Sequence, residues 1–346
     1  MNYKNLALIL NSVLLFLSAF SNPQYKNINA TRLGEILYRE SPYWGSYTLK
    51  LLTEDGDELT IGRITGSPGW SSDGRLLAVG CPSPDIQHIC IINSSAIPYL
   101  RYNPSAPITS APLFVKKLEL PADCVLSFLS LESIEIQSIA WSPNGEKLVV
   151  VCSDTLKTSK ICILNAFNNQ SVCWSSFQNG IARALWNPSG DKIIIAYGER
   201  WINPPIFEVS LDGKNSTEIA RGWSPAVSPD GSKLAFLNGY KEAGTEKRSP
   251  LPGIAILDFA TKQQEWAYTP PALKDVEYLS FGIICGEVRN ETCRLSWSPD
   301  GKSIIFSAKL LDGYVWMIYR LDISTKKITT LINGHSKALS EPVLKP

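Results

Sequence analysis

The stretch Ser296–Trp297–Ser298–Pro299–Asp300–Gly301–Lys302–Ser303–Ile304–Ile305–Phe306 decides the fold, because the chain repeats its pattern. Proline sets φ at the first turn position, aspartate hydrogen-bonds to nearby backbone N–H groups and glycine accepts a positive φ, so Pro–Asp–Gly predicts a tight turn. The apolar run after the turn predicts a buried strand, and the whole stretch predicts a hairpin. Related copies, each with its own apolar run, are Trp70–Val79, Trp141–Val151, Trp186–Ala196 and Val227–Leu237.

Each copy is followed by a third run of β-branched, aromatic and other apolar residues and then by a polar turn, which predicts a unit of four strands. Repeated four-stranded units are typical of the blades of a β-propeller. The third runs are Ile89–Ile92, Ile161–Leu164, Ile206–Val209, Ile254–Leu257 and Trp316–Tyr319.

The spacing of the repeats predicts the number of blades. The turn glycines lie 71, 45, 41 and 70 residues apart. One blade of about 40–45 residues accounts for the two middle values, and the long ones indicate insertions near 98–133 and 262–290. The chain ends supply the remaining blade, with Ile36–Tyr38 as its second strand and Glu341–Leu344 as its first. We therefore predict an all-β, six-bladed β-propeller over 33–346, closed by pairing the C-terminal strand with the N-terminal blade.

The repeats resemble those of the TolB-type β-propeller family, also called WD40-like or PD40 repeats. That family's pattern is W-S-P-D-G-K followed by an L-A-F-like run, and the match is strongest at 297–306. The resemblance covers about Leu33 to Pro346. It implies a six-bladed ring, exported in bacteria, that often acts as a protein-binding scaffold. The namesake carries an α/β domain ahead of its propeller, and we expect that domain to be absent here.

The N-terminal segment predicts a secretory signal peptide. Lys4 precedes the apolar run Leu6–Phe20, and small residues at Ala19 and Ser21 suit cleavage after Ser21. We expect 1–21 to be removed, 22–32 to be a polar linker and no membrane span to remain; an uncleaved anchor is the alternative. The expected location is the bacterial periplasm or the extracellular space.

The charge balance argues against a nucleic-acid partner. Lys and Arg number 33 against 32 Asp and Glu, which gives a net charge of +1. A nucleic-acid-binding protein needs a basic stripe, and none is present. We expect a monomer whose partner is another exported protein or peptide.

The 8 cysteines predict disulfides, because an even number in an exported chain suits pairing. A metal site is the rival interpretation, but the chain lacks Cys-x-x-Cys and has 2 histidines, so we expect no metal and no cofactor. By spacing, and then by elimination, the expected pairs are Cys81 with Cys90, Cys152 with Cys162, Cys285 with Cys293, and Cys124 with Cys173.

Candidate binding residues lie on the face opposite the Asp–Gly turns, which we call the upper face. Irregular loops on a rigid scaffold are where binding residues concentrate. The position three before each tryptophan, or its equivalent, is expected near the mouth of the central channel. Two arginines there would suit a carboxylate or phosphate, although they could instead pair with the glutamate or face water. This set, the channel ring, comprises Ser67, Ser138, Arg183, Ser224, Arg294 and Glu341.

Aromatic residues in the upper-face loops form a second candidate set. Exposed aromatics on one rim suit contact with a peptide or glycan, and the alternative is that they cover the outer ends of the blades. They are Tyr43, Trp44, Trp201, Tyr240 and Tyr314.

The expected function is a binding or interaction module rather than an enzyme. The ligand would be a protein, a peptide or an acidic molecule, held by the upper-face loops and the channel mouth. The alternative is an extracellular hydrolase or lyase acting on a polysaccharide or similar polymer, since paired carboxylates at the channel need no sequence motif.

Overall fold

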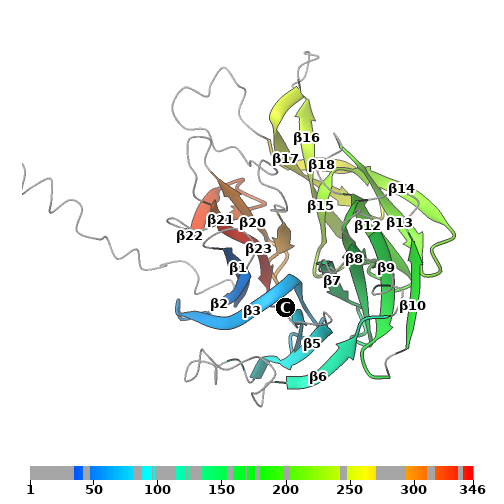
Figure 1. Ribbon diagram of the computed structural model, residues 1–346. Coiled ribbons are helices and arrows are strands. Elements are labelled where there is room, and N and C mark those ends of the chain that lie inside the picture. Colours follow the sequence, from blue (N-terminus) through cyan, green and yellow to red (C-terminus); the bar gives the residue numbers. More distant parts are fainter. Residues whose placement is uncertain are drawn as a thin grey trace, which may run out of the picture.

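The fold is all-β, and its strands are arranged in six blades (Figure 1). Over the described residues, no helix is long and apolar enough to cross a bilayer. The computed structural model describes residues 35–41, 47–81, 88–95, 97, 114–121, 124, 135–153, 159–168, 170–175, 180–197, 203–241, 248–269, 294–309, 316–333 and 338–345.

Blades 1 and 2 share a strand. The long β3 (Glu58–Trp70) pairs with β2 through its first half, up to Ile64, and with β4 through its second half, from Thr65. Blade 1 has the strand order β23 (Ala338–Leu344), β1 (Ile36–Ser41), β2 (Tyr47–Leu52), β3, and blade 2 continues with β4 (Leu76–Cys81), β5 (His88–Asn93) and β6 (Phe114–Glu119).

Blades 3 to 6 are separate four-stranded antiparallel sheets. Blade 3 contains β7 (Glu135–Trp141), β8 (Lys147–Ser153), β9 (Ser159–Asn165) and β10 (Ser171–Ser175). Blade 4 contains β11 (Ile181–Trp186), β12 (Lys192–Tyr197), β13 (Pro205–Ser210) and β14 (Ser216–Arg221). Blade 5 contains β15 (Trp223–Val227), β16 (Lys233–Lys241), β17 (Arg248–Asp258) and β18 (Gln264–Tyr268). Blade 6 contains β19 (Leu295–Trp297), β20 (Ser303–Lys309), β21 (Trp316–Asp322) and β22 (Ile328–Asn333).

The innermost strands close into a ring. Each of β3, β7, β11, β15, β19 and β23 contacts the next, and β23 contacts β3. The predicted closure is confirmed, because β23 pairs antiparallel with β1 from Ile36 opposite Leu344 to Ser41 opposite Ala338. At this seam, Lys345 Nζ pairs with Glu35 Oε2 at 2.8 Å.

The two expected insertions each contain the outermost strand of a blade. Strand β6 lies within 98–133 and completes blade 2, while β18 lies within 262–290 and completes blade 5. The extra residues therefore follow or flank a fourth strand, and most of them are outside the described residues.

The repeated turns are closed by hydrogen bonds of the predicted kind. In blade 6, Gly301 N donates to Ser298 O at 2.9 Å, and Ser298 Oγ donates to Asp300 Oδ1 at 2.6 Å. Gly301 has a φ of 67°, a conformation that glycine adopts without strain. The turn between the third and fourth strands bonds to the same hairpin, since Ile323 N donates to Lys302 O at 3.0 Å. Both kinds of turn therefore lie on one face, the turn face.

Tryptophans at the ends of the inner strands join neighbouring blades. The indole N–H of Trp297 donates to Ala226 O at 2.9 Å, and that of Trp141 donates to Gly69 O at 3.0 Å. Their rings are buried between the sheets, where each blade's apolar residues pack against the next blade's. The tryptophan of the motif is thus a wedge and a hydrogen-bonded link in one residue.

Two of the expected disulfide pairs are wrong. Cys124 bonds to Cys152, and Cys162 bonds to Cys173. Cys162 and Cys173 are direct cross-strand partners in β9 and β10, whereas Cys152 lies opposite Lys160. Cross-strand opposition therefore decides the pairing more than sequence spacing does. Cys90 is also disulfide-bonded, and the side chains of the expected partners Cys81, Cys285 and Cys293 are outside the described residues.

Candidate functional site

The residues of the channel ring belong to, or directly precede, the inner strands of the six blades. Arg294 directly precedes β19, whose other end leads into the turn at Ser298. The remaining members lie in their blades' innermost strands: Ser67 in β3, Ser138 in β7, Arg183 in β11, Ser224 in β15 and Glu341 in β23.

Arg294 reaches across the ring. Its Nη2 donates a hydrogen bond of 2.7 Å to the carbonyl oxygen of Gln137, in β7. Blades 3 and 6 are opposite each other in a six-bladed ring, so this bond spans the channel. Arg294 is 6% exposed, and the bond holds its buried guanidinium against the inner strand of the opposite blade.

Two serines of the channel ring link neighbouring blades. Ser67 Oγ donates to the same Gln137 carbonyl at 2.9 Å, and Ser138 Oγ donates to Ala184 O at 3.3 Å. Both serines are buried. Their hydroxyl groups therefore have a structural partner on the next blade.

The other ring members are less enclosed. Arg183 and Ser224 are half-buried, and Ser224 has a φ of 50°, an uncommon value for a non-glycine residue. Glu341 lies in β23, opposite Arg183's blade, and its side chain is outside the described set.

The second candidate set, the aromatic residues of the upper-face loops, stays a prediction. Tyr240 lies in β16, but its side chain is not among those described. The other members lie outside the described residues: Tyr43, Trp44, Trp201 and Tyr314.

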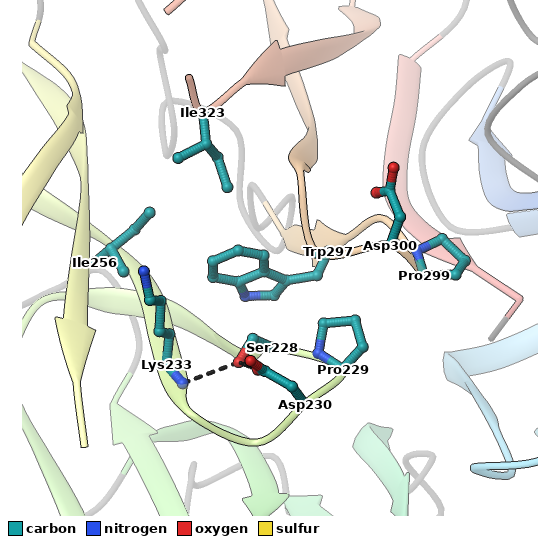
Figure 2. Close-up of a pocket in the computed structure, with 10 residues that line it drawn as sticks. Ser228, Pro229, Asp230, Lys233, Ile256, Trp297, Pro299, Asp300 and Ile323 are labelled. Atoms are coloured by element: carbon teal, nitrogen blue, oxygen red, sulfur yellow. Dashed lines mark hydrogen bonds between the residues drawn. The ribbon is translucent and has the colours of Figure 1, made fainter. Parts of the chain in front are cut away.

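A pocket that the sequence did not indicate lies on the opposite face, between blades 5 and 6. We call it the turn-face pocket; its volume is about 440 Å³. Figure 2 shows the indole of Trp297 at its centre, with Ser228 and Asp230 on one side and Asp300 on another. Its lining residues are Ser228, Pro229, Asp230, Lys233, Ile256, Trp297, Pro299, Asp300, Gly301 and Ile323. These residue types occur in the other repeats, so no sequence signal distinguishes this junction.

The hydrogen bonds of the turns keep the pocket's two carboxylates ionised. Bonds from Ser228 Oγ and from the backbone and side chain of Ser232 lower the pKa of Asp230 to about 2. The pKa of Asp300 is lowered chiefly by the hydrogen bond from Ser298 Oγ. The pocket therefore carries negative charge at neutral pH.

The described residues offer little for a metal ion. Their only cluster of three or more potential ligands is Cys124, Cys162 and Cys173, all of which are in disulfides. His88 lies on β5, and burial, followed by the charge of Lys117, lowers its pKa. His335 is outside the described part of the chain.

Comparisons with known proteins agree on the class, a six-bladed β-propeller similar to TolB-like and other propellers. The TolB structure from Acinetobacter baumannii matches at a TM-score of 0.61 and 16% identity, covering 90% of this chain and 67% of that one. A nidogen/laminin complex matches at 0.55 and 10%, covering 90% and 98%. An oligogalacturonate lyase in complex with manganese matches at 0.53 and 11%, covering 88% and 75%.

The likeness is structural only. No family model matches the chain, and no curated protein matches it in sequence. At these identities the similarity shows the fold, and function has to be argued from the site.

Proposed function

We propose that this protein is an exported binding module that holds an acidic group of a partner protein or peptide at the channel mouth. The observation that carries the proposal is the bond from Arg294 to Gln137 across the ring. A guanidinium held in place by the opposite blade is preorganised, so a ligand carboxylate meets it without an ordering cost. Arginine is the side chain whose planar fork matches a carboxylate.

Arg183 adds a second cation to the ring. It lies in β11 next to Ala184, whose carbonyl oxygen accepts the inter-blade hydrogen bond from Ser138. The two arginines outnumber the single carboxylate of the channel ring, Glu341, so the ring attracts anions more than cations. The proposed ligand is therefore an acidic peptide segment or a chain terminus.

Export is supported by the disulfides. Cys124–Cys152 and Cys162–Cys173 both lie within blade 3 and its approach. Such bonds persist in oxidising compartments such as the bacterial periplasm or the extracellular space. The partner would then be another exported molecule.

The test uses an acetylated Gly-Glu-Asp-Glu peptide with a free C-terminus as the probe and its Gln/Asn amide as the neutral match. We expect calorimetry to show at least tenfold tighter binding of the acidic peptide to the intact mature protein. Arg183→Met combined with Arg294→Met should remove that preference. Arg221→Met is the matched control, because Arg221 is exposed on β14 and pairs with Glu218. Equal binding of both peptides, or unchanged binding by the double variant, would refute the proposal.

The alternative is a hydrolase or lyase acting on a polymer such as a polysaccharide. A propeller of this shape is compatible with such chemistry, since one similar structure is an oligogalacturonate lyase. Turnover of oligogalacturonate, followed by the absorbance of the unsaturated product, would favour this alternative.

A further inference from the structure

The turns of neighbouring blades touch at three junctions of the turn face. Between blades 2 and 3, Ser72 Oγ donates to Pro143 O at 2.8 Å. Between blades 3 and 4, a Cβ placed on Gly190 would lie 3.5 Å from the ring of Pro143. Between blades 4 and 5, a Cβ on Gly231 would lie 2.6 Å from Pro188. At the last two of these junctions, the proline of one turn thus packs against the glycine of the next.

This contact is missing between blades 5 and 6. A Cβ on Gly301 would have no atom within 4 Å, although Pro229 is in the position of the packing proline. Gly145 has similar open space, but there Ser72 bonds the two turns together. The turn-face pocket occupies the gap, and both Pro229 and Gly301 line it. The junction is therefore open where its counterparts are closed.

The pocket combines an aromatic surface with apolar walls. The hydrogen bond from Trp297 Nε1 to Ala226 O fixes the indole ring. Ile256 and Ile323 lie to the left of and above the ring, and Pro229 and Pro299 lie to its right (Figure 2). A ligand that enters would contact the exposed part of Trp297, which is 6% exposed, and the aliphatic carbon of Ile323 and the two prolines.

The lining residues of the pocket carry more negative than positive charge. Asp230 and Asp300 are both exposed, and Lys233 is the one cationic side chain among the lining residues. The lining thus has a net charge of −1. The charges around the pocket are of both signs, because the positive charges of Lys302 and Arg320 also lower the pKa of Asp300. Arg320 Nε donates a hydrogen bond of 2.9 Å to Ser303 Oγ.

We propose that the turn-face pocket binds an arginine side chain of a partner peptide. A planar guanidinium stacks on an indole and pairs with a carboxylate, and its aliphatic stem suits the isoleucine and proline walls. This site lies on the face opposite the channel mouth and takes a ligand of opposite charge. Its function is therefore independent of the proposed acidic-ligand site.

The probe is acetyl-Pro-Arg-Pro amide, and its match replaces arginine with citrulline, which keeps the shape and removes the charge. We expect calorimetry with the full mature protein to show at least tenfold tighter binding of the arginine peptide, weakening as salt rises. Arg183→Met with Arg294→Met should leave this binding unchanged.

The decisive variant is Asp230→Asn with Asp300→Asn. Blade 3 shows that asparagine supports the same turn, since Ser142 Oγ donates to Asn144 Oδ1 at 2.7 Å. The double variant should therefore fold and lose at least tenfold in affinity for the arginine peptide. Asp73→Asn, in the equivalent turn of blade 2, is the matched control and should bind normally.

A second variant fills the pocket without changing charge. Ile323→Trp, at a half-buried position on the pocket wall, should block the arginine peptide. Three outcomes would overturn the proposal: no binding at millimolar peptide, equal binding of the citrulline peptide, or full binding by the folded aspartate double variant.

Discussion

Arg294 and Gln137 are joined by a hydrogen bond of 2.7 Å although they belong to opposite blades of the ring. Most contacts in a propeller join neighbouring blades, as the bond from Ser67 Oγ to the same carbonyl does. The bond from Arg294 is a transverse link across the channel. It connects two parts of the molecule that pack against different neighbours.

Replacing Arg294 with methionine should destabilise the protein by about 2 kcal/mol, because a buried charge-assisted hydrogen bond is lost. Gln137 O retains the bond from Ser67 Oγ, so the cost should stay in this range. Urea unfolding measures it. Arg221→Met, at an exposed ion pair, should cost less than about 1 kcal/mol. Equal costs for the two variants would mean that the cross-channel bond adds nothing to stability.

Two tryptophan wedges allow the indole hydrogen bond to be separated from packing. Trp297 donates to Ala226 O, whereas the indole nitrogen of Trp70 is buried without a hydrogen-bond partner in the described part of the chain. We expect Trp297→Phe to cost about 1–2 kcal/mol more than Trp70→Phe. Denaturant unfolding of both variants provides the comparison. A larger loss for Trp70→Phe would contradict this account.

The turn aspartates should make stability depend on acid. The pKa is lowered in Asp73, Asp191, Asp212, Asp230 and Asp300 chiefly by the serine hydroxyl two residues earlier. A carboxyl group whose pKa is lower in the folded state stabilises the fold above its unfolded pKa of 3.8 and stops doing so as pH falls through its folded pKa, about 2 for Asp230.

We therefore expect the melting temperature to fall between about pH 5 and about pH 2. Asp230→Asn removes one titrating group while keeping an acceptor oxygen, so its profile should be shallower. Calorimetric melting across this range checks both statements. A flat wild-type profile would show that the turn hydrogen bonds form equally in the unfolded chain.

The disulfide pairing can be determined directly by peptide mapping. Proteolysis without reduction, followed by mass spectrometry, should find Cys124 linked to Cys152 and Cys162 linked to Cys173. Sγ of Cys124 and Sγ of Cys162 lie 3.3 Å apart, so the digest should be done at acidic pH to prevent exchange. A peptide that links Cys152 to Cys162 would contradict the structure.

Removing one bond by Cys124→Ala with Cys152→Ala should lower the free energy of unfolding by about 3 kcal/mol. The same loss should follow selective reduction. A change below about 0.5 kcal/mol would mean that blade 3 packs equally well without the bond.

The ring of blades could be predicted from the sequence because each repeat carries its own turn residues and its own apolar run. The turn at Ser298–Gly301 requires its own residue types, and the apolar run after it requires burial, so both are visible in one repeat. The seam between β23 and β1 was also predictable, since an incomplete repeat stands at each end. Pairing of the cysteines was not, because Cys124 lies in the insertion near 98–133, whose path no repeat specifies.

The candidate site stays a prediction, and the contacts of its residues could not be predicted from the sequence. The bond from Arg294 to Gln137 depends on the distance between opposite blades, which no sequence pattern encodes. The turn-face pocket is further from prediction. Pro229 and Gly301 have the same residue types as the prolines and glycines of the other turns, so the sequence does not distinguish this junction.

The seam between Glu35 and Lys345 has a consequence for how the molecule assembles. These partners are 310 residues apart in the chain, so β1 has no partner on one edge during most of synthesis. An unpaired edge can recruit strands of other chains, and the entropy of closing so long a loop delays its protection. We therefore expect the pairing of β23 with β1 to come late in folding, and a factor that shields the edge of β1 until then should raise the yield of folded protein.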